Sequence, residues 1–208
     1  MAVESRAAPV YDGSVMTRDF IYQEDFLPAA DCARLIACFE RSRNLLFRNP
    51  EGDPFWDNRY LWITSLPEAE REAKRIMQDA RHRIIAALKA FYGEPEVYSD
   101  SVQLVKWSPG QGMPPHADNA NPDGSPHITP HRDYASVVYL NDDYEGGEFF
   151  FPNTGVEVKP VTGLLVAFTG GMRHFHGVKE VRGAARYTMP GWYTRDVAHR
   201  DPSSLEEY

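Results

Sequence analysis

The feature that most constrains the fold is a change in sequence character at Val97. From that residue onward the chain consists of short runs rich in β-branched and aromatic residues, separated by clusters of Gly, Pro, Asn and Asp. Such runs favour β-strands, and the clusters favour turns. Six runs show the pattern: SVQLVKW, YASVVYL, GEFFF, VEVKP, GLLVAF and RYTMPGWYT. Several short strands of this kind are typical of a double-sheet jelly roll. We therefore predict a mainly β fold with a jelly-roll core over residues 97–195.

The segment 28–93 is predicted to supply helices that support this core. One helix is expected to begin at Pro28 and to bury an apolar stripe that starts at Cys32. A second is expected to begin at the capping box Ser65-Leu66-Pro67-Glu68 and to end at Gly93. Its apolar stripe consists of Ala69, Ala73, Ile76, Ala80, Ile84, Leu88 and Phe91. The two helices would then flank one face of the β core.

Length and composition fit a single domain. A chain of 208 residues with 42% hydrophobic and 25% charged residues can bury a core of its own. We predict a flexible N-terminal arm over residues 1–14, one domain over residues 15–200 and a disordered acidic tail over residues 201–208. No apolar run approaches the roughly 18 residues that a membrane span requires. The N-terminus also lacks the pattern of a secretory signal.

Charge and cysteine content narrow the partners and the compartment. The formal net charge is −8 and no basic cluster stands out, which argues against nucleic-acid binding. Cys32 and Cys38 fall in a predicted helix, where six residues span about 9 Å, too far for a disulfide. Reduced thiols favour the cytoplasm. We expect a small-molecule or peptide substrate, no nucleic-acid or membrane partner, and a monomer or homodimer.

Three residues in the β-rich half form a metal-ligand pattern. His116 and Asp118 are two residues apart, so in a strand both side chains point to the same side. A jelly roll can bring a distant strand beside them, and His176 is the predicted third ligand. Two imidazoles and one carboxylate can hold Fe(II) on one face of an octahedron and leave the opposite face open. His-x-Asp alone is a common loop pair, but the downstream histidine and the β-rich sequence between them favour a metal site.

Two more residues belong to this neighbourhood. Arg186 follows His176 by ten residues, where such a site needs a cation to hold the distal carboxylate of 2-oxoglutarate. His174 competes with His176 as the ligand, because the two would share one side of a strand. We choose His176, which fixes the ten-residue step to Arg186. His174 is expected to lie behind the ligands or at the surface.

The segment between Asp118 and Asp133 is predicted to form a lid over the site. It contains Gly124 and several prolines that exclude a helix, and it is long for a connection inside a compact barrel. It starts at the predicted metal site, so its polar groups are placed to meet a substrate. The candidate substrate-binding residues are Asn119, His127, His131, Arg132 and Tyr134.

Four segments between residues 103 and 194 carry a resemblance to a known family. They are Pro115-His116-Ala117-Asp118-Asn119, Arg132-Asp133-Tyr134, the run YLNDDYEGGEF from Tyr139 to Phe149, and His176-Gly177-Val178-Lys179 with Arg186. Together they resemble the Fe(II)- and 2-oxoglutarate-dependent prolyl hydroxylase group, and most of all the catalytic domain of the leprecan-type prolyl 3-hydroxylases.

This resemblance implies a double-stranded β-helix and a specific chemistry. It implies an enzyme that splits 2-oxoglutarate to succinate and CO₂ while it hydroxylates a C–H bond with O₂. It implies that His116, Asp118 and His176 bind Fe(II) and that Arg186 binds 2-oxoglutarate. Ascorbate is a candidate stimulant of such an enzyme.

Three positions depart from the prolyl 4-hydroxylase pattern and leave the substrate open. Those relatives usually carry Tyr at the positions of Trp107 and Met113, and Thr at the position of Phe149. Trp107 keeps an N–H donor, so we expect it to contact 2-oxoglutarate through its indole N–H in place of a tyrosine hydroxyl. The expected substrate is a prolyl, amino-acid or related small molecule or peptide. The alternatives are desaturation or cyclisation of a small metabolite by the same cofactor chemistry, and a cupin-like metal protein without redox activity.

Overall fold

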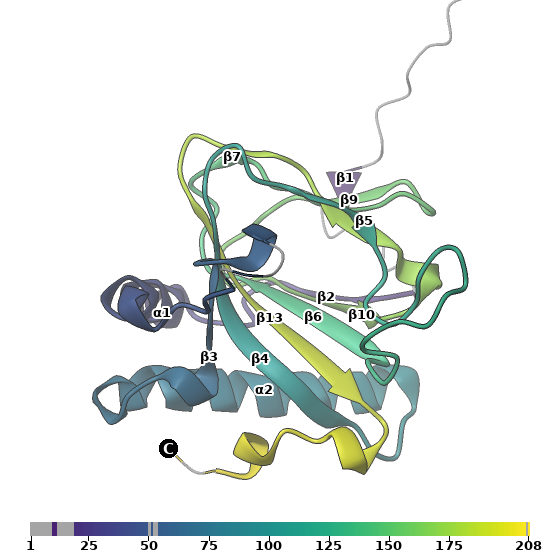
Figure 1. The fold of residues 1–208 in the computed structure, drawn as a ribbon, viewed down its shortest axis with the longest axis horizontal. Helices are drawn as coiled ribbons and strands as arrows, with labels where there is room; N and C mark the ends of the chain where they lie inside the picture. Colours follow the sequence, from purple (N-terminus) through teal and green to yellow (C-terminus); the bar gives the residue numbers. More distant parts are fainter. Residues whose placement is uncertain (1–9, 12–18, 50, 52–53, 207) are drawn as a thin grey trace, which may run out of the picture.

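The computed structural model describes residues 10–11, 19–49, 51, 54–206 and 208. Two β-sheets face each other, and two α-helices lie against the outer face of the larger one (Figure 1). The larger sheet has the strand order β2-β10-β6-β13-β4-β3, and the smaller has the order β1-β9-β8-β11-β5. The prediction of a mainly β fold with a jelly-roll core and flanking helices is confirmed.

Most of the strands are short, as the sequence pattern indicated, and the exceptions are β4 and β13 with ten and nine residues. The larger sheet contains β2 (Ile21–Gln23), β3 (Tyr60–Trp62), β4 (Tyr98–Trp107), β6 (Tyr134–Tyr139), β10 (Leu165–Thr169) and β13 (Arg186–Thr194). The smaller sheet contains β1 (Val10–Tyr11), β5 (Met113–His116), β8 (Phe149–Phe151), β9 (Val156–Val158) and β11 (His176–Val178). A separate two-stranded ladder joins β7 (Glu145–Gly146) to β12 (Val181–Arg182). Among these described strands, paired neighbours are antiparallel except β1 and β9.

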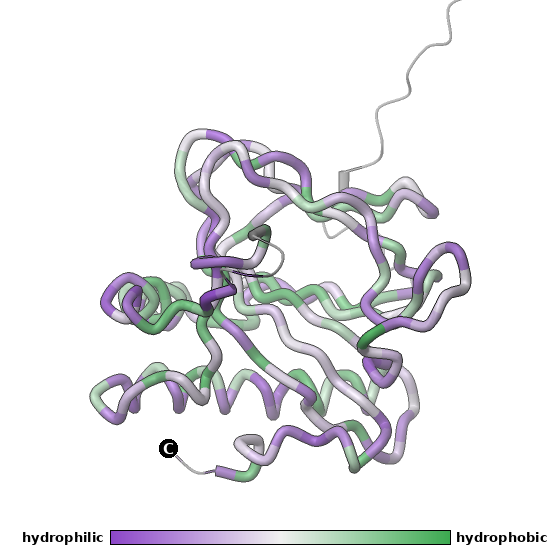
Figure 2. Tube along the Cα trace, in the orientation of Figure 1, coloured by the Kyte–Doolittle hydropathy of each residue, from purple (hydrophilic) through white to green (hydrophobic). Residues whose placement is uncertain are grey.

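Alternation along the strands divides the apolar residues into two layers. On β6, Tyr134 and Val138 pack toward the helices, whereas Ala135 and Tyr139 face the space between the sheets. The helices α1 (Ala29–Arg41) and α2 (Arg71–Tyr92) bury one stripe each in the first layer, and polar and apolar residues alternate along α2 in Figure 2. Each fully buried aliphatic side chain contributes roughly 1.5–3 kcal/mol. The apolar residues of the two helices with the least exposure are Cys32, Leu35, Cys38, Met77 and Leu88.

The ends of α2 differ in how well the sequence predicted them. Gly93 ends the helix with a φ of 71°, as expected of a glycine cap. The predicted capping box is wrong: Ser65 ends a 3-10 turn, and no side chain caps either Glu68–Glu70 or α2. Phe91 is 38% exposed and not part of the core. The 3-10 helices among the described residues are Arg43–Leu45, Pro54–Trp56, Ile63–Ser65, Glu68–Glu70, Met172–His174, Val197–His199 and Pro202–Leu205.

The C-terminal segment is folded, so the prediction of a disordered tail is wrong. Asp201 caps the 3-10 helix Pro202–Leu205 by accepting from the backbone N–H of Ser203. Its carboxylate also pairs at 2.9 Å with Arg81, a residue of α2 that is fully buried. Gln78, one turn earlier, donates to the backbone oxygens of Ser204 and Glu206. A buried arginine needs an acidic partner, and nothing in the local sequence showed that this partner lies 120 residues away.

Most of the predicted N-terminal arm, residues 1–14, lies outside the described residues. The exception is β1, which pairs in parallel with β9. Within the part of the chain that the structure describes, no helix is both long and apolar enough to cross a membrane.

Candidate metal centre

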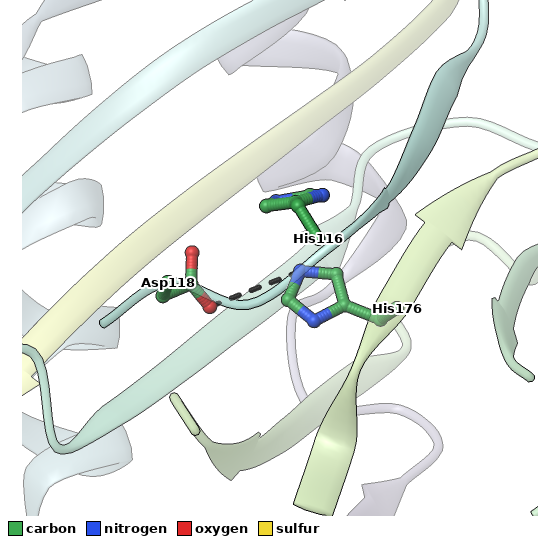
Figure 3. A group of neighbouring side chains, drawn as sticks. All are labelled: His116, Asp118 and His176. Carbon is green, nitrogen blue, oxygen red and sulfur yellow. Dashed lines mark ion pairs between the residues drawn. The ribbon is translucent and has the colours of Figure 1, made fainter. Parts of the chain in front are cut away.

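His116, Asp118 and His176 come together at one end of the space between the sheets (Figure 3). His116 ends β5 and His176 begins β11, and the antiparallel register places the two residues opposite each other. Asp118 follows two residues after His116. One ligand atom from each residue lies within 4.8 Å of the others, and Nε2 of His176 is 3.8 Å from Oδ2 of Asp118. The three predicted ligands are therefore neighbours.

Backbone carbonyls orient both imidazoles. The Nδ1–H of His176 donates to the oxygen of His174 at 2.8 Å, and that of His116 donates to the oxygen of Pro114 at 3.2 Å. The lone pair of each Nε2 is then free to bind a metal ion. Burial lowers the pKa of His176 to about 4, against the opposing effect of the Asp118 charge. At neutral pH this ring is therefore in the uncharged form that metal ions require.

The residues present fit a divalent metal ion. Oδ2 of Asp118 is buried and has no hydrogen-bond partner among the described residues. An unpartnered buried carboxylate oxygen is costly unless a cation compensates it. Two neutral imidazoles and one carboxylate are the donor set of non-haem Fe(II) sites.

His174 is buried but does not belong to the ligand cluster. It is 2% exposed, and its Nδ1 accepts hydrogen bonds from the backbone and hydroxyl of Thr169. Its ring packs edge-on against Phe20 and also contacts Phe151. A surface position is therefore excluded. The contact of His174 with His176 is made by its backbone oxygen alone.

A cavity of about 250 Å³ connects the three candidate ligands with Arg186. Arg186 is 2% exposed, forms no ion pair with any described residue, and its Nε has no hydrogen-bond partner there. Trp107 also lines the cavity, with its ring centroid 6.0 Å from the guanidinium carbon of Arg186. The rest of the lining is largely apolar and includes Val105, Met113, Ala135, Val137, Phe149, Phe168, Val178 and Pro190.

Two tyrosines that sequence reasoning missed stand beside Arg186. The hydroxyls of Tyr139 and Tyr144 are buried without hydrogen-bond partners among the described residues. Burial raises the pKa of both, and the charge of Arg186 opposes that rise. Gly147 permits the packing, since a Cβ there would lie 2.9 Å from the Tyr144 ring and 3.0 Å from the Arg186 side chain. A buried cation beside two tyrosine hydroxyls is a suitable environment for a carboxylate.

Two of the five predicted substrate residues line the cavity. Arg132 lies there with its guanidinium carbon 4.3 Å from the centroid of the Trp192 ring, and its Nε donates to Asp100 at 2.8 Å. His127 also lines the cavity, and its Nδ1 accepts from the backbone of Thr129. Both come from the predicted lid, whose neighbouring residue Ile128 is 91% exposed at the mouth.

The other three predicted substrate residues do not reach the cavity. Tyr134 faces the helices and donates to Glu94, because the alternation of β6 turns it away. The ring of His131 stacks on that of His199, with 3.8 Å between centroids. Asn119 ties the two ends of the lid together by donating to the backbone oxygen of Arg132 at 2.9 Å. Their assignment to substrate binding is therefore corrected.

Trp192 is a cavity residue that the sequence could have identified. Its Nε1–H donates to Oδ1 of Asp118 at 2.7 Å. It lies in the same strand as Arg186, and residues two apart in a strand share a face. The cavity lining contains four successive alternate residues of β13, starting from the arginine: Arg186, Thr188, Pro190 and Trp192.

Comparisons with known proteins agree with this geometry. Residues 102–194 match the sequence model of the 2OG-Fe(II) oxygenase superfamily, where 2OG is 2-oxoglutarate. Human prolyl 3-hydroxylase 3 is 38% identical over 105 residues, which cover 45% of this chain and 14% of that protein. Chicken prolyl 3-hydroxylase 1 is 39% identical over 80 residues, covering 36% of this chain and 11% of that protein. The chain thus spans only a small part of the length of these curated relatives.

Solved structures show the same fold. A Pseudomonas putida prolyl-4-hydroxylase superposes with a TM-score of 0.62 at 26% identity, covering 86% of this chain and 94% of that one. A Trichoplax adhaerens prolyl hydroxylase, solved with a peptide fragment of the hypoxia inducible factor oxygen degradation domain, has a TM-score of 0.68 at 22% identity and covers 92% and 89%. The resemblance to the prolyl hydroxylase group predicted from the motifs is confirmed. The match to the 2OG-Fe(II) oxygenase superfamily covers residues 102–194, a little under half of this chain.

Proposed function

We propose that this chain is an Fe(II)- and 2-oxoglutarate-dependent dioxygenase that hydroxylates a C–H bond of its substrate. One observation carries the proposal: the triad His116, Asp118 and His176 lines the same largely apolar cavity as Arg186, a buried cation with no acidic partner among the described residues. A metal-chelating dicarboxylate needs a metal ion at one end and a cation at the other.

The roles of the individual residues follow from their contacts. Nε2 of His116, Nε2 of His176 and Oδ2 of Asp118 would hold Fe(II). When bound with 2-oxoglutarate and O₂, the iron supplies the oxidation that places a hydroxyl on carbon, with release of succinate and CO₂. Arg186 would bind the distal carboxylate of 2-oxoglutarate, and Trp107 would line its path.

The remaining residues control the environment of that reaction. The hydroxyls of Tyr139 and Tyr144, buried beside Arg186, would donate to the same carboxylate that Arg186 would bind. Apolar side chains such as Phe149 and Phe168 exclude water and so strengthen the electrostatic contacts inside the cavity.

The substrate would enter beside the lid, between Arg132 and His127. Asp100 holds Nε of Arg132, while neither Nη atom donates to another described residue. These two groups can bind a carboxylate or carbonyl oxygen of a prolyl, amino-acid or related peptide substrate. The names of the relatives, which are prolyl hydroxylases, favour a prolyl group.

We also propose that the protein acts in the cytoplasm and that its reaction is a redox reaction. Cys32 and Cys38 are both free and buried, as expected of a protein from a reducing compartment. Ascorbate, which keeps iron reduced, is proposed as a stimulant. Desaturation or cyclisation of a small metabolite is the alternative outcome of the same chemistry.

Succinate release tests the proposal. The purified chain is incubated with Fe(II), 2-oxoglutarate and O₂, with and without ascorbate, against a panel of free amino acids and prolyl peptides. We expect succinate only when iron is present, with more of it when the correct substrate is added, and none from the His116→Ala variant. Mass spectrometry of the product separates the outcomes: hydroxylation adds one oxygen atom, whereas desaturation or cyclisation removes two hydrogens. A chain that binds the metal yet never releases succinate would instead be a metal protein without redox activity.

A further inference from the structure

Trp192 makes a direct contact with the carboxylate of Asp118. The indole Nε1–H of Trp192, near the end of β13, donates to Oδ1 of Asp118 at 2.7 Å. The two residues are 74 positions apart in the chain: Trp192 lies in the larger sheet, whereas Asp118 lies two residues after β5 of the smaller sheet. The bond is short, as is typical of a donor facing an ionised acceptor. An indole has one N–H and no acceptor nitrogen, so it can serve only as a donor to this oxygen.

This contact distinguishes the two oxygens of Asp118. Oδ1 is occupied by Trp192, whereas Oδ2 is buried without a partner among the described residues and lies 3.8 Å from Nε2 of His176. The backbone of Asp118 is held as well: its N–H donates to Gly170, and its oxygen accepts from the hydroxyl of Thr129, both at 2.8 Å. Asp118 is therefore held at its carboxylate by Trp192 and at its backbone by Gly170 and Thr129, and Oδ2 is left facing His176.

The indole ring is itself held in place. The guanidinium of Arg132 lies over it at 4.3 Å from the centroid, and Asp100 holds that guanidinium through Nε at 2.8 Å. A cation over an aromatic face is attracted to the ring. It also withdraws electron density from the ring, which makes the indole N–H a stronger donor. Asp100, Arg132 and Trp192 thus form a chain of contacts that ends at Asp118.

We propose that Trp192 is a positioning residue for the metal centre. By occupying Oδ1, it makes Asp118 bind the metal ion through one oxygen and keeps a coordination position open for the co-substrate. The inference rests on the proposed function, because it assigns the triad as the metal ligands. Partners that orient metal ligands commonly change metal affinity by 10- to 100-fold when removed.

The Trp192→Phe variant tests this inference, since it keeps an aromatic ring beneath Arg132 and removes only the N–H donor. Co(II), whose visible absorption reports its ligand number and geometry, is titrated into the metal-free protein. We expect Trp192→Phe to bind Co(II) about 10- to 100-fold more weakly and to show an altered absorption spectrum. The matched control is Trp62→Phe, which removes an indole that neither lines this cavity nor contacts Asp118. It should keep both the affinity for Co(II) and the spectrum. Unchanged affinity and spectrum in Trp192→Phe would overturn the inference.

Thermal unfolding separates positioning from mere packing. A packing role would lower the melting temperature of the metal-free and Co(II)-loaded variant equally. A positioning role reduces the rise in melting temperature that Co(II) produces, because weaker binding stabilises the folded state less. An equal rise in Trp192→Phe and the unaltered chain would contradict the proposal.

The unaltered chain supplies a second measurement in case Trp192→Phe does not fold. The chain has four tryptophans, and their indole N–H signals can be assigned by NMR with the Trp56→Phe, Trp62→Phe and Trp107→Phe variants. Adding diamagnetic Zn(II) should shift the Trp192 signal more than the other three. No such shift would overturn the inference. Metal binding without any succinate release would overturn only the proposed function, whereas an unaltered chain that binds neither Co(II) nor Zn(II) would overturn both.

Discussion

Arg186 and Trp107 are register partners on the adjacent antiparallel strands β13 and β4. The guanidinium carbon lies 6.0 Å from the Trp107 ring centroid and 5.1 Å from that of Tyr139. Aromatic rings attract a guanidinium but do not neutralise it, so the buried charge still requires an anionic ligand. This relationship makes Arg186 the strongest candidate in the cavity for binding a carboxylate.

Replacing Arg186 should weaken co-substrate binding and leave metal binding nearly unchanged. Removing one partner of a buried charge pair commonly costs ~2–5 kcal/mol, so Arg186→Ala should raise the apparent KM for 2-oxoglutarate by about tenfold or more. Succinate release at varied 2-oxoglutarate measures this effect, and Co(II) titration measures metal affinity. The control is Arg182→Ala, which removes an exposed arginine from β12. An unchanged KM in Arg186→Ala would point to Arg132 as the carboxylate-binding residue.

The two neighbouring histidines should respond differently to truncation. His176→Ala removes a proposed ligand and should reduce Co(II) affinity on the order of 100-fold or more. His174→Ala should bind Co(II) nearly as well as the unaltered chain, because His174 supports His176 through its backbone oxygen, which alanine retains. It should still unfold at a lower temperature, since its buried ring is lost. If only His174→Ala lost Co(II) binding, the assignment of the third ligand would have to be reversed.

Ile128 should contribute to substrate binding although it is 91% exposed. It lines the mouth of the cavity from the lid, so a bound substrate would cover it. Burial of part of this side chain is worth about 1 kcal/mol, so Ile128→Ser should raise the substrate KM about fivefold. The KM for 2-oxoglutarate should not change. Leu205→Ser, which alters another exposed apolar side chain outside the cavity lining, serves as the control. Equal KM values for the two variants would mean that the lid does not contact the substrate.

The local sequence predicted β13 and the spacing of the triad because both depend on short-range patterns. Strand alternation and the His-x-Asp spacing are properties of a few consecutive residues. The local sequence did not predict the orientation of Tyr134 and His131. That orientation depends on which side of the sheet the helices and the C-terminal segment cover. The partners of Arg186 and Trp192 were missed for a related reason. Tyr144 and Asp118 reach them only through the closure of the two sheets.

Cys32 and Cys38 should be unreactive in the folded chain. Burial raises the pKa of Cys32 to about 11, with a further contribution from the Asp31 charge, and raises that of Cys38 to about 12. Because the folded pKa values exceed the unfolded ones, the thiols add stability that is complete below about pH 8.5. That stability is lost as the pH rises from there toward about 11. Labelling with a disulfide reagent near neutral pH should be slow until denaturant is added, and urea unfolding should show the alkaline decline. Rapid labelling of the folded chain would contradict the prediction.

Asp201 should be important for stability although it lies in the C-terminal segment. Its removal leaves the fully buried charge of Arg81 without its acidic partner. Breaking a buried ion pair from one side costs about 3 kcal/mol or more, which at this chain length corresponds to a fall in melting temperature of roughly 6–12 °C. Glu206→Ala, which removes a nearby acid whose side chain accepts from Tyr208, should have little effect. If the two variants had the same melting temperature, the Arg81–Asp201 pair would not be stabilising.

The same ion pair constrains the order in which parts of the chain can fold during synthesis. Arg81 leaves the ribosome 120 residues before Asp201, so α2 can form early but cannot bury its charged face without that carboxylate. Until Asp201 is available, α2 would pack only weakly against the larger sheet. Final docking of α2 would then follow the synthesis of β13, which carries Arg186 and Trp192. The outer face of the larger sheet would thus be covered last, with the help of a segment that takes no part in the chemistry.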